Sequence, residues 1–334
     1  MEHIAILGAG SWGTALAQVL ADNNARVTLW TISEEQKEEI NKHHTNKEYV
    51  GDVILPDTIF PTTSLEDAIK DTKIIVIAVP TKAIREVLGK LKEVLKDKYI
   101  FVNVAKGIEP DTNKLVSEII EDEIPKEHIE GIVILSGPSH AEEVILRQIT
   151  TIVSASESET LAKQIQYLFN NDYLRVYTST DIRGVQMCGA LKNVIALASG
   201  IIAGKGYGDN TRAALITRGM AEIIRYGTHH GALKETFGGL AGIGDLIVTA
   251  TSTHSRNFMA GYRVGQGEDP KESVNKSKMV VEGIRTAKAV YEELKNLNFE
   301  MPITTAVYKV FYENYDVDEA IKELMNRELK SEIE

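Results

Sequence analysis

Residues 4–20 read IAILGAGSWGTALAQVL, which is a short apolar run, a glycine turn and an apolar helical pattern. Gly8, Gly10 and Gly13 have the G-x-G-x-x-G spacing of a dinucleotide-binding turn, with strand and helix flanking it in the required order. The glycines permit a tight turn, close backbone approach to a pyrophosphate, and close packing of helix on strand. The helix start adds unpaired N–H groups that attract phosphate. We therefore predict a dinucleotide site here, the alternative being a purely structural turn.

The sequence beyond this turn alternates between strand and helix patterns. Apolar strands are predicted at 26–30, 73–80, 99–104, 132–135, 151–154 and 174–177. Such alternation is typical of a mostly parallel sheet covered on both faces, so we predict a Rossmann-type, doubly wound α/β fold. From about Asp181 only helical patterns remain. We expect two domains, a dinucleotide-binding domain over 1–180 and an all-helical substrate and catalytic domain over 181–334.

The end of the second predicted strand bears on the choice of cofactor. NAD sites usually carry an acid there, and NADP sites a nearby arginine. This chain has Thr31-Ile32-Ser33, with acids only from Glu34 onward. The choice between NAD and NADP stays open, although the missing basic residue favours acceptance of NADH.

The stretch 184–204, GVQMCGALKNVIALASGIIAG, is apolar on nearly every face and predicts a helix buried all round. Lys192 lies in its middle, and burial lowers the pKa of a lysine towards working pH, which suits a general acid or base. The alternatives are a lysine that reaches the surface or pairs with a carboxylate. Because Gln186, Lys192 and Asn193 interrupt the run, we expect no membrane span.

Two further groups follow predicted strands. Lys106 and the turn Gly137-Pro138-Ser139 come directly after strand patterns. Ligands of parallel sheets bind beyond the carboxyl ends of the strands, so both should face the cofactor crevice. A solvated loop lysine is the alternative for Lys106.

The second half contains two polar sites in apolar surroundings. A glycine-rich loop over 237–245 ends on Asp245, and Thr249 follows one helical turn later on the same face. Ser255, Arg256 and Asn257 open a predicted helix, where N–H groups, a hydroxyl and a guanidinium suit a phosphate. An ordinary N-cap with a solvated arginine remains open. Another helix is predicted over 211–226, capped by Asp209-Asn210 and ended by Gly227.

Composition narrows the classes of function. The net charge of −11 argues against nucleic acid or an anionic membrane as a partner, though not against a small anionic substrate. The single cysteine, Cys188, cannot form a disulfide framework, and no metal site is expected. No signal sequence is apparent before the first strand, so we expect a cytoplasmic protein.

Taken together, the motifs resemble those of the bacterial-type NAD(P)-dependent glycerol-3-phosphate dehydrogenase family. The matching segments are GAGSWGTALA, AKGIE at Lys106, SGPS at Gly137, GALKNVIALASGI at Lys192, GGLAGIGDLIVT at Asp245, SRN at 255–257, VVEG at 280–283 and MPIT at 301–304. Their combined order and spacing, over nearly the whole chain, carry the resemblance.

The resemblance implies hydride transfer between NAD or NADP and C2 of sn-glycerol 3-phosphate or dihydroxyacetone phosphate, in a homodimer that supplies phospholipid synthesis. It assigns Lys192 as the proton acceptor or donor. The implied substrate-binding residues are Lys106, Gly137, Ser139, Lys192, Asp245, Ser255, Arg256 and Asn257. The implied cofactor-binding residues are Gly8, Gly10, Ser11, Trp12, Gly13, Tyr49, Lys106, Ala141, Arg256, Val280 and Glu282.

Three departures from the family pattern are visible. Ile32 and Ser33 stand where many members carry basic residues, His140 replaces an aromatic residue, and Phe258-Met259 replace arginine or tyrosine. Two alternative functions remain open. Another hydroxy-acid dehydrogenase with a helical half should lack the GIGD and SRN segments. A non-catalytic dinucleotide sensor would need neither a buried Lys192 nor a phosphate clamp.

Overall fold

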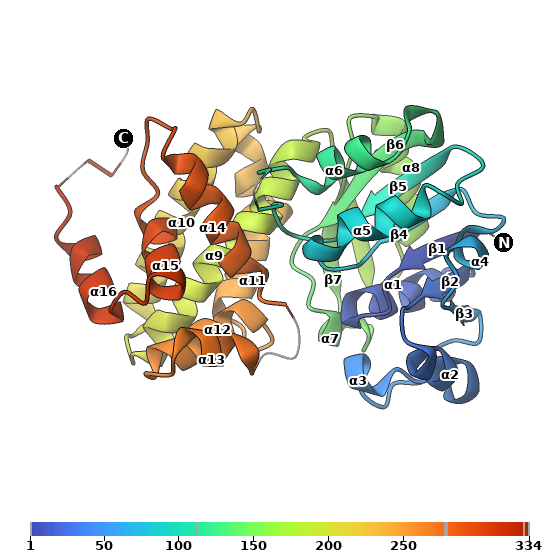
Figure 1. Ribbon diagram of the computed structural model, residues 1–334, viewed down its shortest axis with the longest axis horizontal. Coiled ribbons are helices and arrows are strands. Elements are labelled where there is room, and N and C mark those ends of the chain that lie inside the picture. Colours follow the sequence, from blue (N-terminus) through green and yellow to red (C-terminus); the bar gives the residue numbers. More distant parts are fainter. Residues whose placement is uncertain (1, 111, 277–279, 330, 333–334) are drawn as a thin grey trace.

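The computed structural model describes residues 2–110, 112–276, 280–329 and 331–332. A sheet-containing half comes first, and a helical half begins with α9 (Ile182–Gly204). The two halves lie side by side, with the C-terminal end of the chain at the far side of the helical half (Figure 1). This arrangement confirms the predicted fold class.

Eight strands form one sheet in the order β3-β2-β1-β4-β5-β6-β7-β8. Their bounds are β1 His3–Leu7, β2 Arg26–Trp30, β3 Ile59–Thr62, β4 Ile74–Ile77, β5 Tyr99–Asn103, β6 Ile129–Ser136, β7 Thr150–Ala155 and β8 Leu174–Ser179. Neighbouring strands are parallel except β6 and β7, which are antiparallel. The strand order reverses at β1, and the carboxyl ends at such a point form the crevice where ligands bind.

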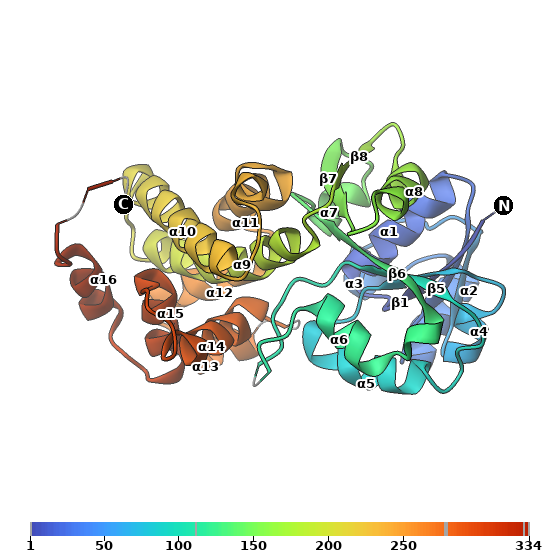
Figure 2. The ribbon, with the colours of Figure 1, turned by 90° about the horizontal axis from the view of Figure 1, so that it is seen from above.

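Helices cover both faces of the sheet, as the buried strand patterns predict (Figure 2). Ile4 and Ile6 of β1 pack into one apolar core, while Ala5 and Leu7 pack into another on the opposite face. The first core includes α1 (Ser11–Asp22), α2 (Glu34–His43), α7 (Ala141–Val144) and α8 (Glu159–Phe169). The second includes α4 (Leu65–Ile69), α5 (Thr81–Leu91) and α6 (Val116–Glu123). The short α3 (Lys47–Val50) lies beside α1.

Helix α9 is the centre of the helical half, and every residue from Gly184 to Ile202 is buried. The helices packed on it are α10 (Asp209–His229), α11 (Asp245–Thr251), α12 (Arg256–Gly265), α14 (Glu282–Leu294) and α15 (Pro302–Tyr312). Two more, α13 (Pro270–Asn275) and α16 (Val317–Met325), lie further out. A Cβ at Gly261 would meet the carbonyl oxygen of Leu197 at 2.0 Å, so α12 crosses α9 at backbone contact. The prediction of a helix buried on all sides is confirmed.

Among the described residues, α9 is the one helix long and apolar enough to cross a membrane, and 89% of its apolar window is buried inside the protein. Its apolar surface is therefore covered by the neighbouring helices.

Two local predictions in this half were wrong. Helix α10 begins at Asp209 after an N-cap at Gly208 that makes no side-chain bond, and it continues through Gly227 to His229. Gly227 lies inside the helix because a Cβ there would meet the ring of Phe237 at 2.3 Å. The predicted loop before Asp245 is instead a short 3-10 turn, Lys234–Gly238, followed by a wider helical turn, Leu240–Gly244, that runs into α11.

Candidate active site

Lys192 and Asp245 meet where α9 packs against α11. The Lys192 ammonium donates to Asp245 Oδ1 and also to the hydroxyl of Thr249 at 2.8 Å. Thr249 in turn donates to the backbone carbonyl of Asp245 at 2.7 Å, one helical turn earlier, which places both residues on the same face of α11 as predicted. The side chain of Asp245 is 1% exposed and that of Lys192 is 7% exposed. Lys192 is thus buried and paired rather than directed to the surface.

Lys106 reaches the same carboxylate from the sheet half. Its ammonium lies 2.7 Å from Asp245 Oδ2 and 3.0 Å from the carbonyl oxygen of Gly137. Ser139 donates its hydroxyl to the same carbonyl at 2.9 Å. Lys106 follows β5 and Gly137 follows β6, so the carboxyl edge of the sheet and the helical half meet at one carboxylate. Two ammonium groups therefore flank Asp245.

This arrangement shifts two pKa values. Burial, together with the nearby Lys106 ammonium, lowers the pKa of Lys192 to about 7, although Asp245 acts in the opposite direction. Burial alone would raise the pKa of Asp245, but Lys106 and Lys192 outweigh it and hold that pKa below its usual value. The site therefore combines a carboxylate that is charged near neutrality with a lysine that can gain and lose a proton there.

A chain of amide contacts supports this cluster. Asn193 donates to the carbonyl of Lys106 at 3.4 Å and accepts from the side-chain amide of Asn257 at 2.9 Å. Asn257 accepts from the backbone N–H of Gly283 at 2.9 Å. These bonds tie α9, α12 and α14 to the strand end that carries Lys106.

Ser255 and Arg256 have different environments. Ser255 is the buried N-cap of α12, and its hydroxyl accepts from the N–H of Phe258 at 3.2 Å. Arg256 is exposed, and among the described residues its guanidinium makes no hydrogen bond or ion pair. A cation of this kind at a helix start is available to an incoming anion.

The glycine turn has the geometry of a dinucleotide cradle. Gly8 has φ 121°, and a Cβ there would meet the carbonyl oxygen of Ala78 at 2.7 Å. A Cβ at Gly13 would meet the carbonyl of Gly8 at 1.9 Å, whereas one at Gly10 would meet nothing within 4 Å. Helix α1 begins after Gly10 with no side-chain cap and no acid in its first turn. Its free N–H groups and the open space at Gly10 fit a pyrophosphate.

The other predicted cofactor residues lie around this turn and around the strand ends. The hydroxyl of Ser11 donates to the carbonyl of Tyr49 at 2.9 Å, which fixes α3 beside the turn. Trp12 is half-buried against the core of the sheet half, and Ala141 is a buried residue of α7. Val280 directly precedes Val281, the N-cap of α14.

Glu282 links the two halves of the chain. One of its carboxylate oxygens accepts from the backbone N–H of Thr81, at the start of α5, at 3.1 Å. Its other oxygen and the Thr81 hydroxyl are both buried without a hydrogen-bond partner beside Gly107. Unsatisfied buried polar atoms at the carboxyl edge of β4 fit a polar group of a bound cofactor.

Three polar residues of the site were missed at the level of sequence. Thr81 begins α5 and directly follows the strand predicted over 73–80, a position that the strand-end rule could have identified. Gln36 and Asn46 donate to the carbonyl of Ala9 at 2.7 and 2.9 Å and so hold the glycine turn in place. Nothing in their local sequence indicates these contacts, since Gln36 lies in the first turn of α2 and Asn46 lies beyond the end of that helix.

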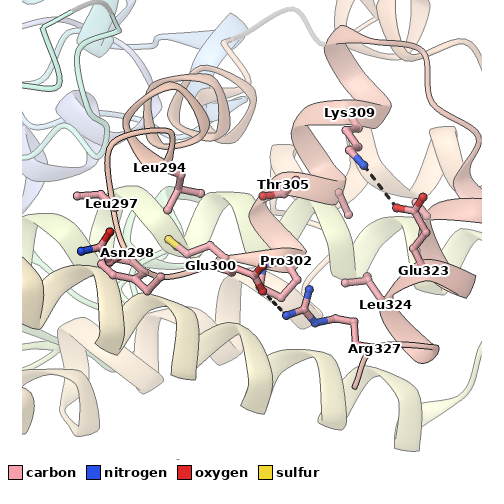
Figure 3. Close-up of a pocket in the computed structure, with 14 residues that line it drawn as sticks. Leu294, Leu297, Asn298, Glu300, Pro302, Thr305, Lys309, Glu323, Leu324 and Arg327 are labelled. Atoms are coloured by element: carbon pink, nitrogen blue, oxygen red, sulfur yellow. Dashed lines mark hydrogen bonds and ion pairs between the residues drawn. The ribbon is translucent and has the colours of Figure 1, made fainter. Parts of the chain in front are cut away.

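A cavity of about 380 Å³ lies elsewhere, between the end of α14, α15 and α16 (Figure 3). Its charged lining groups are paired in two bridges, Lys309 with Glu323 at 3.5 Å and Arg327 with Glu300 at 2.5 Å. The cations of this cavity are already paired, and neither Lys106 nor Lys192 nor Asp245 lines it. The cavity is therefore separate from the candidate active site. The part of the chain described here also holds no cluster of three potential metal ligands.

Comparison with known proteins gives a consistent result. Residues 3–162 match the model for the N-terminal part of NAD-dependent glycerol-3-phosphate dehydrogenase, and residues 181–322 match the model for its C-terminal part. A glycerol-3-phosphate dehydrogenase [NAD(P)+] of Staphylococcus haemolyticus is 53% identical over 332 residues, covering 99% of this chain and 100% of the relative. The crystal structure of glycerol-3-phosphate dehydrogenase from Coxiella burnetii superimposes with TM-score 0.93 at 35% identity, covering 98% of this chain and 99% of that one. A D-mandelate dehydrogenase, at TM-score 0.64 and 15% identity, shares the fold alone.

Proposed function

The chain belongs to the NAD-dependent glycerol-3-phosphate dehydrogenase family, and from this premise we propose that Lys192 exchanges the proton of the reaction with the substrate. The reaction is the NAD(P)-dependent interconversion of dihydroxyacetone phosphate and sn-glycerol 3-phosphate. The substrate is therefore a small phosphorylated molecule. The observation that carries the proposal is the buried Lys192 ammonium between Asp245 and Thr249, with a pKa near neutrality.

The chemistry needs a hydride and a proton. The bound nicotinamide supplies or accepts the hydride at C2. In the direction of reduction, the Lys192 ammonium donates a proton to the oxygen on C2 as its negative charge develops, and in the direction of oxidation neutral Lys192 removes it. Lys106 supplies a second positive charge that stabilises the alkoxide. Asp245 holds both ammonium groups at 2.7 Å or closer, and so positions them.

The phosphate end of the substrate requires a separate anchor. We assign it to Arg256 and the start of α12, because that guanidinium is exposed and has no partner of its own. Ser255 and Asn257 flank it at the start of α12, while Gly137 and Ser139 follow β6 in the sheet half, where Gly137 contacts Lys106. Anchoring the phosphate far from C2 fixes the orientation of the reacting carbon.

The experiment is the pH dependence of kcat/KM in both directions, measured with the same cofactor. Because Lys192 must be protonated for reduction and neutral for oxidation, reduction should fall and oxidation should rise as pH passes through about 7. Two rates that fail to respond in opposite senses to one ionisation near neutrality would remove Lys192 from this role. The ionisation of the substrate phosphate near pH 6 is recorded separately with the free substrate.

We also propose the broader setting of the enzyme. The chain divides into a dinucleotide-binding domain over 1–180 and a substrate domain over 181–334. The enzyme works in the cytoplasm as a homodimer. Glycerol phosphate carries two hydroxyls that can be acylated, which supports a role in supplying phospholipid synthesis. Sedimentation at micromolar concentration tests the dimer, and a monomer there would refute it.

A further inference from the structure

The segment directly after β2, Thr31–Glu35, lies against the glycine turn. Leu7 and Trp30 are partners in the parallel pairing of β1 with β2, and the N–H of Gly8 donates to the carbonyl of Trp30 at 3.0 Å. In this fold a dinucleotide bound at the turn places the ribose of its adenosine over the end of β2. NADP differs from NAD only by a phosphate on the 2′-oxygen of that ribose. The side chains of this segment therefore meet the one group that distinguishes the two cofactors.

Both hydroxyls of the segment make hydrogen bonds within the protein. Thr31 is 4% exposed and donates its hydroxyl to the side-chain oxygen of Gln36. Ser33 is the N-cap of α2, and its hydroxyl accepts from the N–H of Gln36 at 3.1 Å. Gln36 also donates to the carbonyl of Ala9 in the glycine turn at 2.7 Å. The segment is thus held in one position against the turn.

Ile32 is the side chain that projects from this position. It is 86% exposed, although it is a large apolar residue beside a ligand crevice. An aliphatic side chain here offers a surface to the adenosine but no charge to a phosphate.

The charges nearby are unfavourable for a second phosphate. Glu34 and Glu35 occupy the first turn of α2, where they already balance the positive end of the helix dipole. The Glu34 carboxylate accepts from Thr63 at 2.5 Å and pairs with Lys37 at 2.9 Å. Lys37 is the only basic residue between Thr31 and Glu39, a stretch that the structure describes in full, and its ammonium is committed to Glu34.

We propose that this chain is selective for NAD(H) over NADP(H), and that the segment Thr31–Glu35 sets this selectivity. Ile32 provides an uncharged surface for the adenosine, and the carboxylates of Glu34 and Glu35 repel the 2′-phosphate. The inference rests on the proposed function only in taking the glycine turn as the cofactor site.

The test compares kcat/KM for NADH and NADPH in the wild type and in Ile32→Arg. We expect NADH to be favoured at least about tenfold by the wild type, because the 2′-phosphate of NADPH would find no free cation here and would face the carboxylates of Glu34 and Glu35. Ile32→Arg supplies the missing cation, so the ratio should fall by about ten- to a hundredfold, chiefly through KM for NADPH. The exposure of Ile32 leaves the core unchanged.

The matched control is Ile149→Arg, an equally exposed isoleucine at 88%. Nearby Arg147 pairs with Asp22, at the end of α1 opposite to the glycine turn, so the same charge is added away from the cofactor. The control should leave the ratio within about threefold of the wild type, whereas an equal drop in both variants would show an effect of net charge and overturn the proposal.

Equal use of both cofactors by the wild type, or a preference for NADPH, would also overturn it. Direct titration of NADH and NADPH by fluorescence separates this inference from the proposed function. If NADH binds more tightly but neither cofactor supports turnover, the selectivity stands and the proposed function fails.

Discussion

Asp245→Asn removes the negative charge between Lys106 and Lys192 while keeping the shape of the side chain. Burial and the Lys106 ammonium lower the pKa of Lys192, whereas Asp245 raises it. An opposite charge in contact shifts a pKa by about 1–3 units, so its loss should lower the pKa of Lys192 by about two more units, or about 2.7 kcal/mol. The midpoint for reduction should therefore move from about 7 towards about 5.

The consequence for rate follows from the protonated fraction. With a pKa of about 7, half of Lys192 is protonated at pH 7, and with a pKa near 5 about one molecule in a hundred is. Reduction of dihydroxyacetone phosphate at pH 7 should fall about fiftyfold and recover as pH is lowered towards 5. The assay is kcat/KM for reduction from pH 5 to pH 9, with cofactor affinity measured alongside to establish that the variant is folded.

Thr249→Val is the control, because it removes a neutral partner of Lys192 at 2.8 Å and leaves the carboxylate in place. Its midpoint should move by less than about half a unit, since a neutral hydroxyl perturbs a charge far less than a carboxylate does. The reasoning is refuted if Asp245→Asn lowers the rate by the same factor at every pH, because the midpoint would then not depend on Asp245.

Three further outcomes are expected. Gly10→Val should weaken cofactor binding at least about tenfold with little change in Tm. Gly13→Ala should lower Tm, because its Cβ would lie 1.9 Å from a carbonyl oxygen. Similar effects of the two variants on binding and on Tm would contradict the assignment of this turn as the dinucleotide cradle. Arg256→Ala should raise KM for dihydroxyacetone phosphate by about ten- to a hundredfold, and an unchanged KM would exclude the clamp. Glu222 is buried and accepts from the N–H groups of Ile303 and Thr304, and burial raises its pKa to about 7. The folded state therefore holds this proton more tightly than the unfolded state does. The free energy of unfolding should decrease as pH rises from about 4.5 to 7. In Glu222→Gln that slope should disappear at a cost of about 1–3 kcal/mol, and denaturant melts with an unchanged slope would refute the assignment.

Much of the fold could be predicted from local patterns. The strand, glycine turn and helix over 4–20 follow from backbone requirements at Gly8 and Gly13, where a Cβ would collide with neighbouring backbone. The buried helix around Lys192 is predictable because apolar residues occupy nearly every face of 184–204. These are short-range signals that one segment carries by itself.

Contacts between distant segments could be predicted only in part. Asp245 stood out as a carboxylate in an apolar run, but its simultaneous pairing with Lys106 and Lys192 depends on how the two halves meet. The bond from Thr81 to Glu282 joins residues 201 positions apart, and no local pattern indicates it. The sequence predicts a helix end at Gly227, whereas the small size of this residue serves tertiary packing against Phe237.

The most direct test of the central claim is single-turnover reduction of dihydroxyacetone phosphate by Lys192→Ala, with NADH bound beforehand and small primary amines added to the buffer. Loss of a positioned proton donor should slow the reduction by about 10²–10⁴-fold while NADH affinity stays within about threefold. An ammonium small enough to enter the space left by the side chain should restore part of the rate. Reduction within about tenfold of the wild type without any amine would show that another group carries the proton, and would contradict the account.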